Sequence, residues 1–432
     1  MSAKKFPWTR TFLIGFGFLG ISIIWPIFNQ YLPIFLQAGN PEFERQLLEQ
    51  GREVPNIVGF GLAPSLALFI MTWDNILNMF IAPWAGAKSD RTWNRFGRRK
   101  PYILIGAPIA LLAFIFIPVA QTLLALMVFI FITNLGMAIF RSPTVAWLGD
   151  LFEANDRSKA NGVINFMGGV GGLLAFFGGG MLFNTFGRNA PFLAGAIATT
   201  LALAAVLFFV KEPKERMNTE NEAPSPNILE SLKLLFSNPD KGGLMVLVSI
   251  LFWFMAYSAL DAGLSSFAVF TLGMQAGTAS IYAGSVTISF ILFAVPAGLA
   301  GTRFGRESII RYGLIGLAIL TLVGFFFINS PITFLIVLIG AGACWAMVNV
   351  NSLPLVYDHG NEKQIGAYTG LYYFSSQLAA VLGPTLAGIV VEAMGTQYRW
   401  LWLFSAVFML LAFAIMAKVR APIKRGEAQP AA

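Results

Sequence analysis

The sequence predicts an all-α integral membrane protein whose twelve transmembrane helices form two pseudo-symmetric bundles of six. Three observations support this fold class: long apolar runs, a shortage of charge, and a motif that occurs twice. Of the 432 residues, 56% are hydrophobic and 12% are charged, and the mean hydropathy is +0.70. A soluble chain of this length needs far more charge to cover its surface, whereas a chain surrounded by lipid does not.

The apolar runs set the number and order of the helices. A hydrocarbon core about 30 Å thick needs roughly 20 apolar residues per helix. Runs of this length lie at residues 11–36, 57–87, 101–120, 123–150, 161–184, 191–210, 243–270, 277–300, 308–328, 332–356, 366–392 and 399–418. They divide the chain into an N-terminal six-helix bundle (1–210), a polar cytoplasmic linker (211–242), a C-terminal six-helix bundle (243–419) and a cytoplasmic tail (420–432).

Positive charge predicts the orientation of these helices, because basic loops stay in the cytoplasm. The segment 88–101, KSDRTWNRFGRRKP, carries six basic residues and one acid between two apolar runs. With this loop and the N-terminus inside, only four of the 29 Lys and Arg residues lie outside, namely Arg45, Arg52, Arg188 and Arg399. We therefore expect a multi-pass protein of the cytoplasmic (inner) membrane with both termini in the cytoplasm.

Several other classes are disfavoured. The basic residues stand at the ends of apolar runs and not on one polar face, which argues against nucleic acid as a partner. The single Cys344 excludes an intrachain disulfide, and the single His359 leaves no His/Cys metal cluster. No nucleophile stands beside a base, so an enzyme is disfavoured and no cofactor is indicated. Membrane lipid is the expected surrounding, and a monomer is the expected state.

An internal repeat with an offset of 208 residues places six helices in each half. Arg95–Arg98 (RFGR) reappears as Arg303–Arg306, and Gly162 matches Gly370 at the same offset. Duplicated bundles joined by a linker are typical of transporters that rock around a central site. The sequence therefore favours a secondary active transporter that works by alternating access.

The loop between helices two and three, GAKSDRTWNRFGRRKP, resembles the signature loop of the major facilitator superfamily. Its form, SDR followed by RFGRRKP, is similar to the glycoside-pentoside-hexuronide:cation symporters, closest to the sucrose-transporter-like branch. The resemblance implies the major facilitator fold and transport of a sugar (a glycoside, or a disaccharide such as sucrose or maltose) with a proton. A drug or metabolite exporter on the same fold and an uncoupled sugar facilitator remain as alternatives.

The same loop and its copy are candidates for a latch that holds one of two bundle arrangements. Glycine allows a tight turn, and aspartate accepts hydrogen bonds from arginine. An alternative of equal weight is that the arginines only anchor the loop and bind lipid phosphate. The candidate gating residues are Asp90, Arg91, Arg95, Gly97, Arg98, Arg303, Gly305 and Arg306.

Two ionisable residues are expected at mid-membrane depth, where each costs at least about 2.5–3.5 kcal/mol and is a functional candidate by default. Asp74 lies roughly 20 Å from the cytoplasmic end of helix two, and Arg141 lies at a similar depth in helix four. We predict a buried pair in which Asp74 exchanges a proton; the alternative is a permanent salt bridge. Asp261 is expected nearer the outer side, where a polar contact accounts for it. Asp150 and Glu392 fall at helix ends, where the interface accounts for them.

The coupling ion is predicted from a second resemblance. Trp73–Asn75 and Tyr102–Gly106 resemble the melibiose permease branch, in which two helix-two aspartates and one helix-four aspartate bind a cation. Here the corresponding positions hold Asp74, Asn78 and Arg141. An arginine beside one carboxylate repels sodium, so we expect a proton and no metal site.

Sugars are bound by hydrogen-bonding side chains beside aromatic faces. With 41 Phe and 10 Trp in the chain, any single aromatic residue more often faces lipid or packs than binds substrate. The polar and tyrosine side chains at helix depth are therefore the better guide. The substrate-binding candidates are Asn29, Asn75, Asn78, Asn134, Asn165, Tyr257, Asn351, Tyr373 and Gln377.

Overall fold

The computed structural model describes residues 6–152, 154–212, 233, 241–358 and 365–419. Most of the predicted linker (211–242), the whole predicted tail (420–432) and His359 lie outside these residues. Within them, 12 helical spans are long and apolar enough to cross a membrane. The predicted all-α fold class with twelve transmembrane helices is confirmed.

Capping side chains begin two helices of the N-terminal half. The Asn40 side chain accepts a hydrogen bond from the amide of Glu42, and the Thr122 side chain accepts one from Ala125, as expected at helix starts. The elements of this half are α1 (Trp8–Gln37), α2 (Pro41–Glu49), α3 (Pro64–Ile70), α4 (Trp73–Arg91), α5 (Lys100–Phe116), η1 (Ile117–Val119), α6 (Leu123–Leu151), α7 (Ala154–Leu173), η2 (Leu174–Gly178), α8 (Gly179–Phe186) and α9 (Ala190–Phe209).

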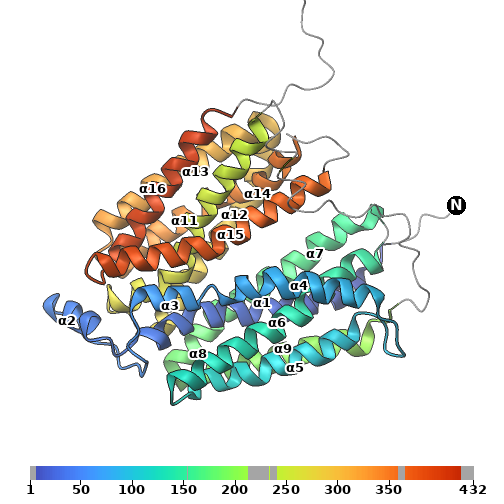
Figure 1. The fold of residues 1–432 in the computed structure, drawn as a ribbon, viewed down its shortest axis with the longest axis horizontal. Helices are drawn as coiled ribbons and strands as arrows, with labels where there is room; N and C mark the ends of the chain where they lie inside the picture. Colours follow the sequence, from blue (N-terminus) through green and yellow to red (C-terminus); the bar gives the residue numbers. More distant parts are fainter. Residues whose placement is uncertain (1–5, 153, 213–232, 234–240, 359–364, 420–432) are drawn as a thin grey trace, which may run out of the picture.

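The C-terminal half forms a second group of helices. Figure 1 shows the blue and green helices on one side and the yellow to red helices on the other, meeting at one end and diverging at the other. We call the end with the 92–99 loop the basic end, and the end with α2 the opposite end. The helices of this half are α11 (Gly242–Phe270), α12 (Ala276–Phe304), α13 (Arg306–Phe327), α14 (Pro331–Asp358), α15 (Ile365–Ala393) and α16 (Arg399–Met416).

The second transmembrane helix differs from the prediction of 57–87. Residues 57–63 are not helical, and the span consists of α3 and α4, which meet at Met71 and Thr72. The reason is a return of the chain over the end of α1: the amides of Phe60 and Gly61 donate to the carbonyls of Phe35 (3.1 Å) and Ala38 (2.9 Å). The break places the start of α4 inside the bundle.

Backbone conformation repeats between the halves at the predicted offset. Gly97 and Gly305, which end the matching basic loops, have φ of +112° and +90°. Gly187 and Gly395, at the opposite end, have φ of +83° and +79°. Side chains rarely adopt this left-handed region, so each half depends on glycine at the same two turns.

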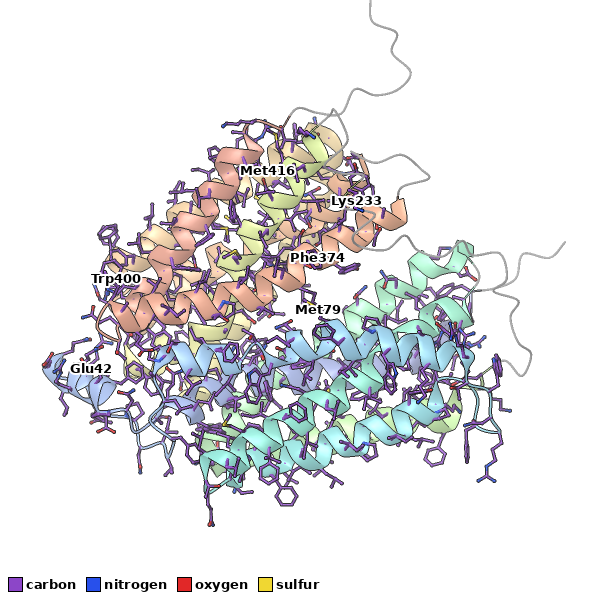
Figure 2. The ribbon with its side chains drawn as sticks, viewed as in Figure 1. Glu42, Met79, Lys233, Phe374, Trp400 and Met416 are labelled. Carbon is purple, nitrogen blue, oxygen red and sulfur yellow. The ribbon has the colours of Figure 1, made fainter. Side chains whose placement is uncertain are left out.

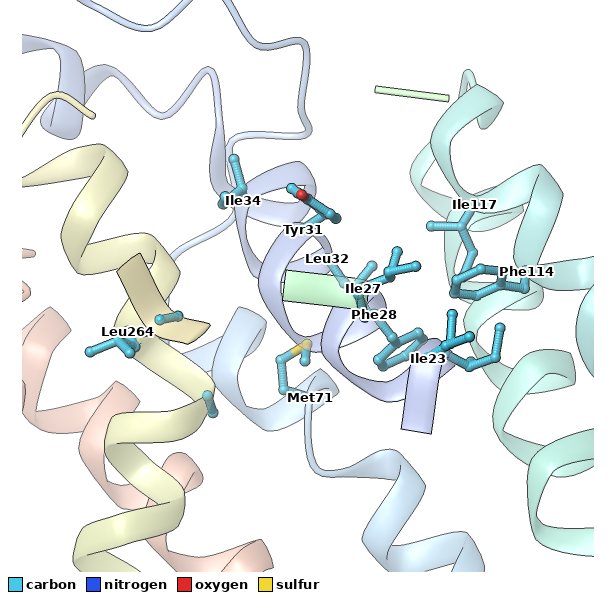
Figure 3. Packing of buried hydrophobic residues seen from close by; sticks show 14 of the residues in the cluster. Ile23, Ile27, Phe28, Tyr31, Leu32, Ile34, Met71, Phe114, Ile117 and Leu264 are labelled. Atoms are coloured by element: carbon cyan, nitrogen blue, oxygen red, sulfur yellow. The ribbon is translucent and has the colours of Figure 1, made fainter. Parts of the chain in front are cut away.

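Helix α1 lies in the centre of the main hydrophobic cluster. It carries apolar residues on every face, as expected for a helix packed on all sides. Figure 3 shows Ile27 and Phe28 of α1 beside Phe114, with Met71 and Leu264 on the other side. All five residues belong to one buried cluster that joins both halves.

Contacts between the halves concentrate at the opposite end, where α15 packs on α3, α12 on α8 and α1 on α11. Gln37 donates to the Ser266 hydroxyl at 2.9 Å and accepts from the Tyr398 hydroxyl at 2.6 Å. Toward the basic end the halves diverge (Figure 1). The structure is therefore closed at the opposite end and open at the basic end.

Residues 38–63, which include α2, reinforce this closure by reaching from the N-terminal half across to the C-terminal half. The Phe43 ring stacks on Phe270 with centroids 4.6 Å apart. The Arg52 guanidinium donates to the carbonyls of Thr271 (2.7 Å) and Asn329 (2.9 Å). We call this segment the strap, because it must release these contacts whenever the opposite end opens.

Candidate functional site

A cavity of about 250 Å³ lies where the two halves meet, and we call it the polar pocket. Asp74 and Arg141 both line it, together with Asn75 and Ser258. Asp74 stands in the first turn of α4, directly after the break in the second span. A helix start favours a carboxylate there, because its free amides carry partial positive charge.

Asp74 and Arg141 share the pocket but make no direct ion pair in the part of the chain that the structure describes. The Asp74 carboxylate accepts a hydrogen bond from the Asn75 side chain at 2.8 Å. The Arg141 guanidinium attracts the Asp74 carboxylate electrostatically, and the Asp261 carboxylate repels it. In this conformation the two members of the predicted pair line one cavity without an ion pair, and the proton exchange by Asp74 stays a prediction.

Asp261 lines the same pocket, although the sequence suggested a contact nearer the outer side. Asp261 does lie nearer the opposite end of α11, and what the sequence analysis missed is that Asp74 lies at the same depth. Counted from the opposite end, Asp74 lies ten residues after Pro64 and Asp261 nine residues before Phe270. At about 1.5 Å per residue, these distances are roughly 15 Å and 14 Å, so the two carboxylates lie at one depth.

A second cavity of about 260 Å³, the aromatic pocket, adjoins the polar pocket and shares Trp25, Asn29 and Asp261 with it. The rings of Tyr257 and Trp345 stack with centroids 4.0 Å apart and planes at 6°. Stacked aromatic faces beside amide and carboxylate groups suit a ligand with both apolar and polar surfaces. Among the predicted candidates, Asn29 and Tyr257 line this pocket.

Three further predicted residues line a cleft of about 590 Å³ between α4 and α15, on the basic-end side of the pockets: Asn78, Tyr373 and Gln377. Figure 2 shows Met79 on α4 and Phe374 on α15 on the two sides of this cleft. These residues lie on the route between the polar pocket and the basic end.

Asn351, Asn165 and Asn134 line none of the three cavities. Asn351 is buried and donates to the carbonyls of Ala297 (3.1 Å) and Met347 (3.0 Å), so its amide holds α12 against α14. Asn165 is exposed and donates to Asn161. Asn134 is 1% exposed, and its side-chain amide has no hydrogen-bond partner among the described residues.

An ion-pair network holds the basic loop to the end of α6. Asp150 accepts from Arg98 at 2.6 Å and from Arg99 at 2.7 Å, and Asp90 lies 2.5 Å from Arg99 and 3.4 Å from Arg98. Sequence reasoning singled out Asp90 and Arg98 but assigned Asp150 to the interface and passed over Arg99. The repeat contained the signal, since Arg306 pairs with Asp358 at 2.5 Å and both lie 208 residues after Arg98 and Asp150.

Glu212 supports this loop from the first residues of the linker. Its carboxylate accepts from the amides of Arg98, Arg99 and Lys100 (2.5, 3.0 and 2.9 Å) and from the Trp147 indole (3.1 Å). These amides begin α5, where a negative charge is favourable.

The remaining gating candidates lie at the surface of the basic end. The guanidinium groups of Arg95 and Arg303 lie over the rings of Phe96 (4.7 Å) and Phe304 (5.2 Å), another contact that the repeat preserves. Arg91 is exposed.

Polar and aromatic cavities enclosed between two helix bundles define a membrane transport protein. The model of the Major Facilitator Superfamily matches residues 10–289 and 264–432. The chain belongs to this superfamily.

Named relatives have both sugar and drug transport in their descriptions. The chain is 22% identical over 374 residues to the isoprimeverose transporter of Lactiplantibacillus pentosus, covering 78% of this chain and 74% of that protein. It is 24% identical over 416 residues to multidrug resistance protein 2 of Bacillus subtilis (strain 168), covering 92% and 91%. Similarity at this level does not decide between the two kinds of substrate.

Solved structures share the fold. A mutant of the nucleoside transporter NupG matches with a TM-score of 0.74 at 15% identity, covering 94% of this chain and 99% of that one. The D-xylose-proton symporter matches with a TM-score of 0.66 at 17% identity, covering 97% and 99%. These matches show that the chain has the major facilitator fold, as the signature loop implied.

Proposed function

We propose that the protein moves a sugar, a glycoside or a disaccharide such as sucrose or maltose, across the cytoplasmic membrane together with a proton. The observation that supports this proposal is the joining of the polar pocket to the aromatic pocket at Asn29 and Asp261. A pyranose has hydroxyl edges and apolar C–H faces, and these two pockets offer groups for both. Asp74, with Arg141 across the pocket, is the proposed proton carrier.

The difference between the two ends of the molecule supports transport by alternating access. The basic end carries the 88–101 loop, and basic loops face the cytoplasm. With this orientation, both termini are cytoplasmic, and the pockets open toward the cytoplasm through the α4–α15 cleft. Rocking of one half on the other would open the strap side and close the basic end. In this scheme the networks of Arg98 and Arg306 brace the basic loops of the two halves.

An exporter of apolar cations is the second candidate. The aromatic pocket favours it, because an acid, Asp261, stands beside the stacked Tyr257 and Trp345 rings, and cations bind aromatic faces. The polar pocket favours the sugar, since Asn29, Asn75 and Ser258 add hydrogen-bonding groups that an apolar cation does not need.

The proton role predicts the behaviour of Asp74→Asn in proteoliposomes. The wild type is expected to concentrate labelled sucrose or maltose under an imposed pH gradient, by up to about tenfold per pH unit at one proton per sugar. Asp74→Asn is expected to lose this accumulation, because an amide cannot exchange the proton.

A matched control removes an exposed carboxylate far from the pockets: Glu49→Gln, whose side chain is 67% exposed, should accumulate sugar like the wild type. Accumulation by Asp74→Asn at the wild-type level would refute the proton role. A wild type that equilibrates sugar without concentrating it is an uncoupled facilitator. Extrusion of ethidium without sugar uptake would identify the exporter.

A further inference from the structure

We propose that Asp261 is the second coupling carboxylate, and that Asp74 and Asp261 share a single proton opposite the fixed charge of Arg141. The inference deepens the proposed function and rests on it. Its basis is a juxtaposition: one cavity of about 250 Å³ holds two carboxylates and one guanidinium. Asp74 and Arg141 come from α4 and α6 of the N-terminal half, and Asp261 comes from α11 of the C-terminal half.

Charge counting indicates how many protons the site holds. With all three groups ionised, two negative charges face one positive charge, so the set carries one net negative charge that attracts a proton. Binding of one proton from the side to which the pocket is open neutralises the set, and its release on the other side restores the starting state. No other reactant is needed, and one proton crosses per cycle.

The other groups that line the pocket do not alter this count. Trp25 and Asn29 of α1 and Ala380 and Pro384 of α15 carry no charge. Tyr257, one turn before Asp261 on α11, is the remaining titratable group beside it, and the charge of Asp261 acts on its hydroxyl. A tyrosine is neutral over the physiological pH range, so the balance lies between the two carboxylates.

The two carboxylates belong to different halves, so binding of the proton affects how the halves are arranged. When both are ionised they repel each other, and the repulsion favours parting of the halves at the opposite end. When one holds the shared proton the repulsion disappears, and the arrangement seen here, closed at the opposite end, becomes more favourable. Acidification should therefore populate the form that is open at the basic end.

The position of Asp261 also links the proton to the substrate. Asp261 lines both pockets, whereas Asp74 lines only the polar pocket. A sugar hydroxyl in the aromatic pocket can donate to the Asp261 carboxylate, which holds that group ionised and leaves the proton on Asp74. The sugar is then bound by Asp261 and the proton by Asp74 in the same conformation, as symport requires.

Spin labels at Lys159 and Thr302, replaced by cysteine in a Cys344→Ala background, would test the shared proton without any substrate. Both positions are exposed, on α7 and α12 near the basic end. In the wild type, in sodium-free buffer, the ratio of long to short label distances should rise about tenfold between roughly pH 8 and pH 5. In Asp261→Asn and in Asp74→Asn the ratio should change less than about twofold, because one carboxylate has no partner to repel.

Two further variants separate the shared site from general damage. Arg141→Gln keeps both carboxylates and should still respond to pH, whereas Glu49→Gln removes an exposed acid away from the pockets and should respond like the wild type. A wild-type response in Asp261→Asn, or a wild type that ignores pH, would overturn the inference. Loss of the response in Asp74→Asn alone would leave the proposed function standing with Asp74 as the sole carrier.

Discussion

Valine in place of Gly277 is expected to prevent closure of the opposite end and to abolish transport. Gly277 on α12 crosses Gly180 on α8 so closely that a Cβ atom would lie 2.2 Å from the Gly180 carbonyl oxygen. The obstacle is backbone, which cannot move aside, so the halves must separate at this crossing. Overpacking of this kind costs about 1–3 kcal/mol, which shifts the conformational equilibrium about 5- to 150-fold.

The same label pair at Lys159 and Thr302 measures this shift, and Gly277→Val should give short distances at the basic end at every pH. Gly172 and Gly178 provide matched controls in the fifth span, because a Cβ atom at either position meets nothing within 4 Å. Alanine at these two positions should transport normally. Wild-type transport by Gly277→Val would show that this crossing is not part of the closed end.

Asp150→Asn is expected to destabilise the protein far more than the repeat-related Asp358→Asn. Asp150 pairs with Arg99, and their side chains are 17% and 4% exposed, whereas Asp358 and Arg306 are 35% and 31% exposed. Loss of one partner from a buried pair costs about 3–5 kcal/mol. An exposed pair contributes about 0–1 kcal/mol, because water screens it.

Thermal unfolding of the two purified variants in the same detergent would compare these costs. The midpoint for Asp150→Asn should fall well below that of the wild type, with Asp358→Asn close to it. Equal midpoints would show that burial does not set the strength of these pairs. The two variants control for each other, because Asp150 and Asp358 stand at the repeat-related ends of α6 and α14. Each pairs with the arginine that follows the repeated glycine, Arg98 and Arg306.

The number and order of the helices followed directly from the sequence, because each span has to cover the membrane with apolar residues. The break in the second span did not. Residues 57–63 are as apolar as a helix, and only their hydrogen bonds to the end of α1 show that they return across it. Such long-range pairing leaves no mark in the local pattern.

Some residues of the candidate site were likewise predictable from the sequence, and others were not. Asp74 and Arg141 were found because charge is rare at membrane depth. Asp261 needed a comparison of its depth with that of Asp74 from the same end of the molecule. Trp345 needed the three-dimensional structure, since nothing local distinguishes it among 10 tryptophans. Asn351 was predicted to bind substrate but instead joins two helices by a hydrogen bond, which a polar side chain in a membrane helix can also do.

The closed opposite end is built without ion pairs between the halves in the described residues. Gln37, Ser266 and Tyr398 are linked by hydrogen bonds, and Phe43 and Phe270 by stacking. Ionic strength screens interactions between charges and has little effect on stacked rings or buried hydrogen bonds. The stacked rings and buried hydrogen bonds of this closure should therefore keep their strength in concentrated salt, so that opening of this end depends on the charges in the polar pocket more than on the salt outside.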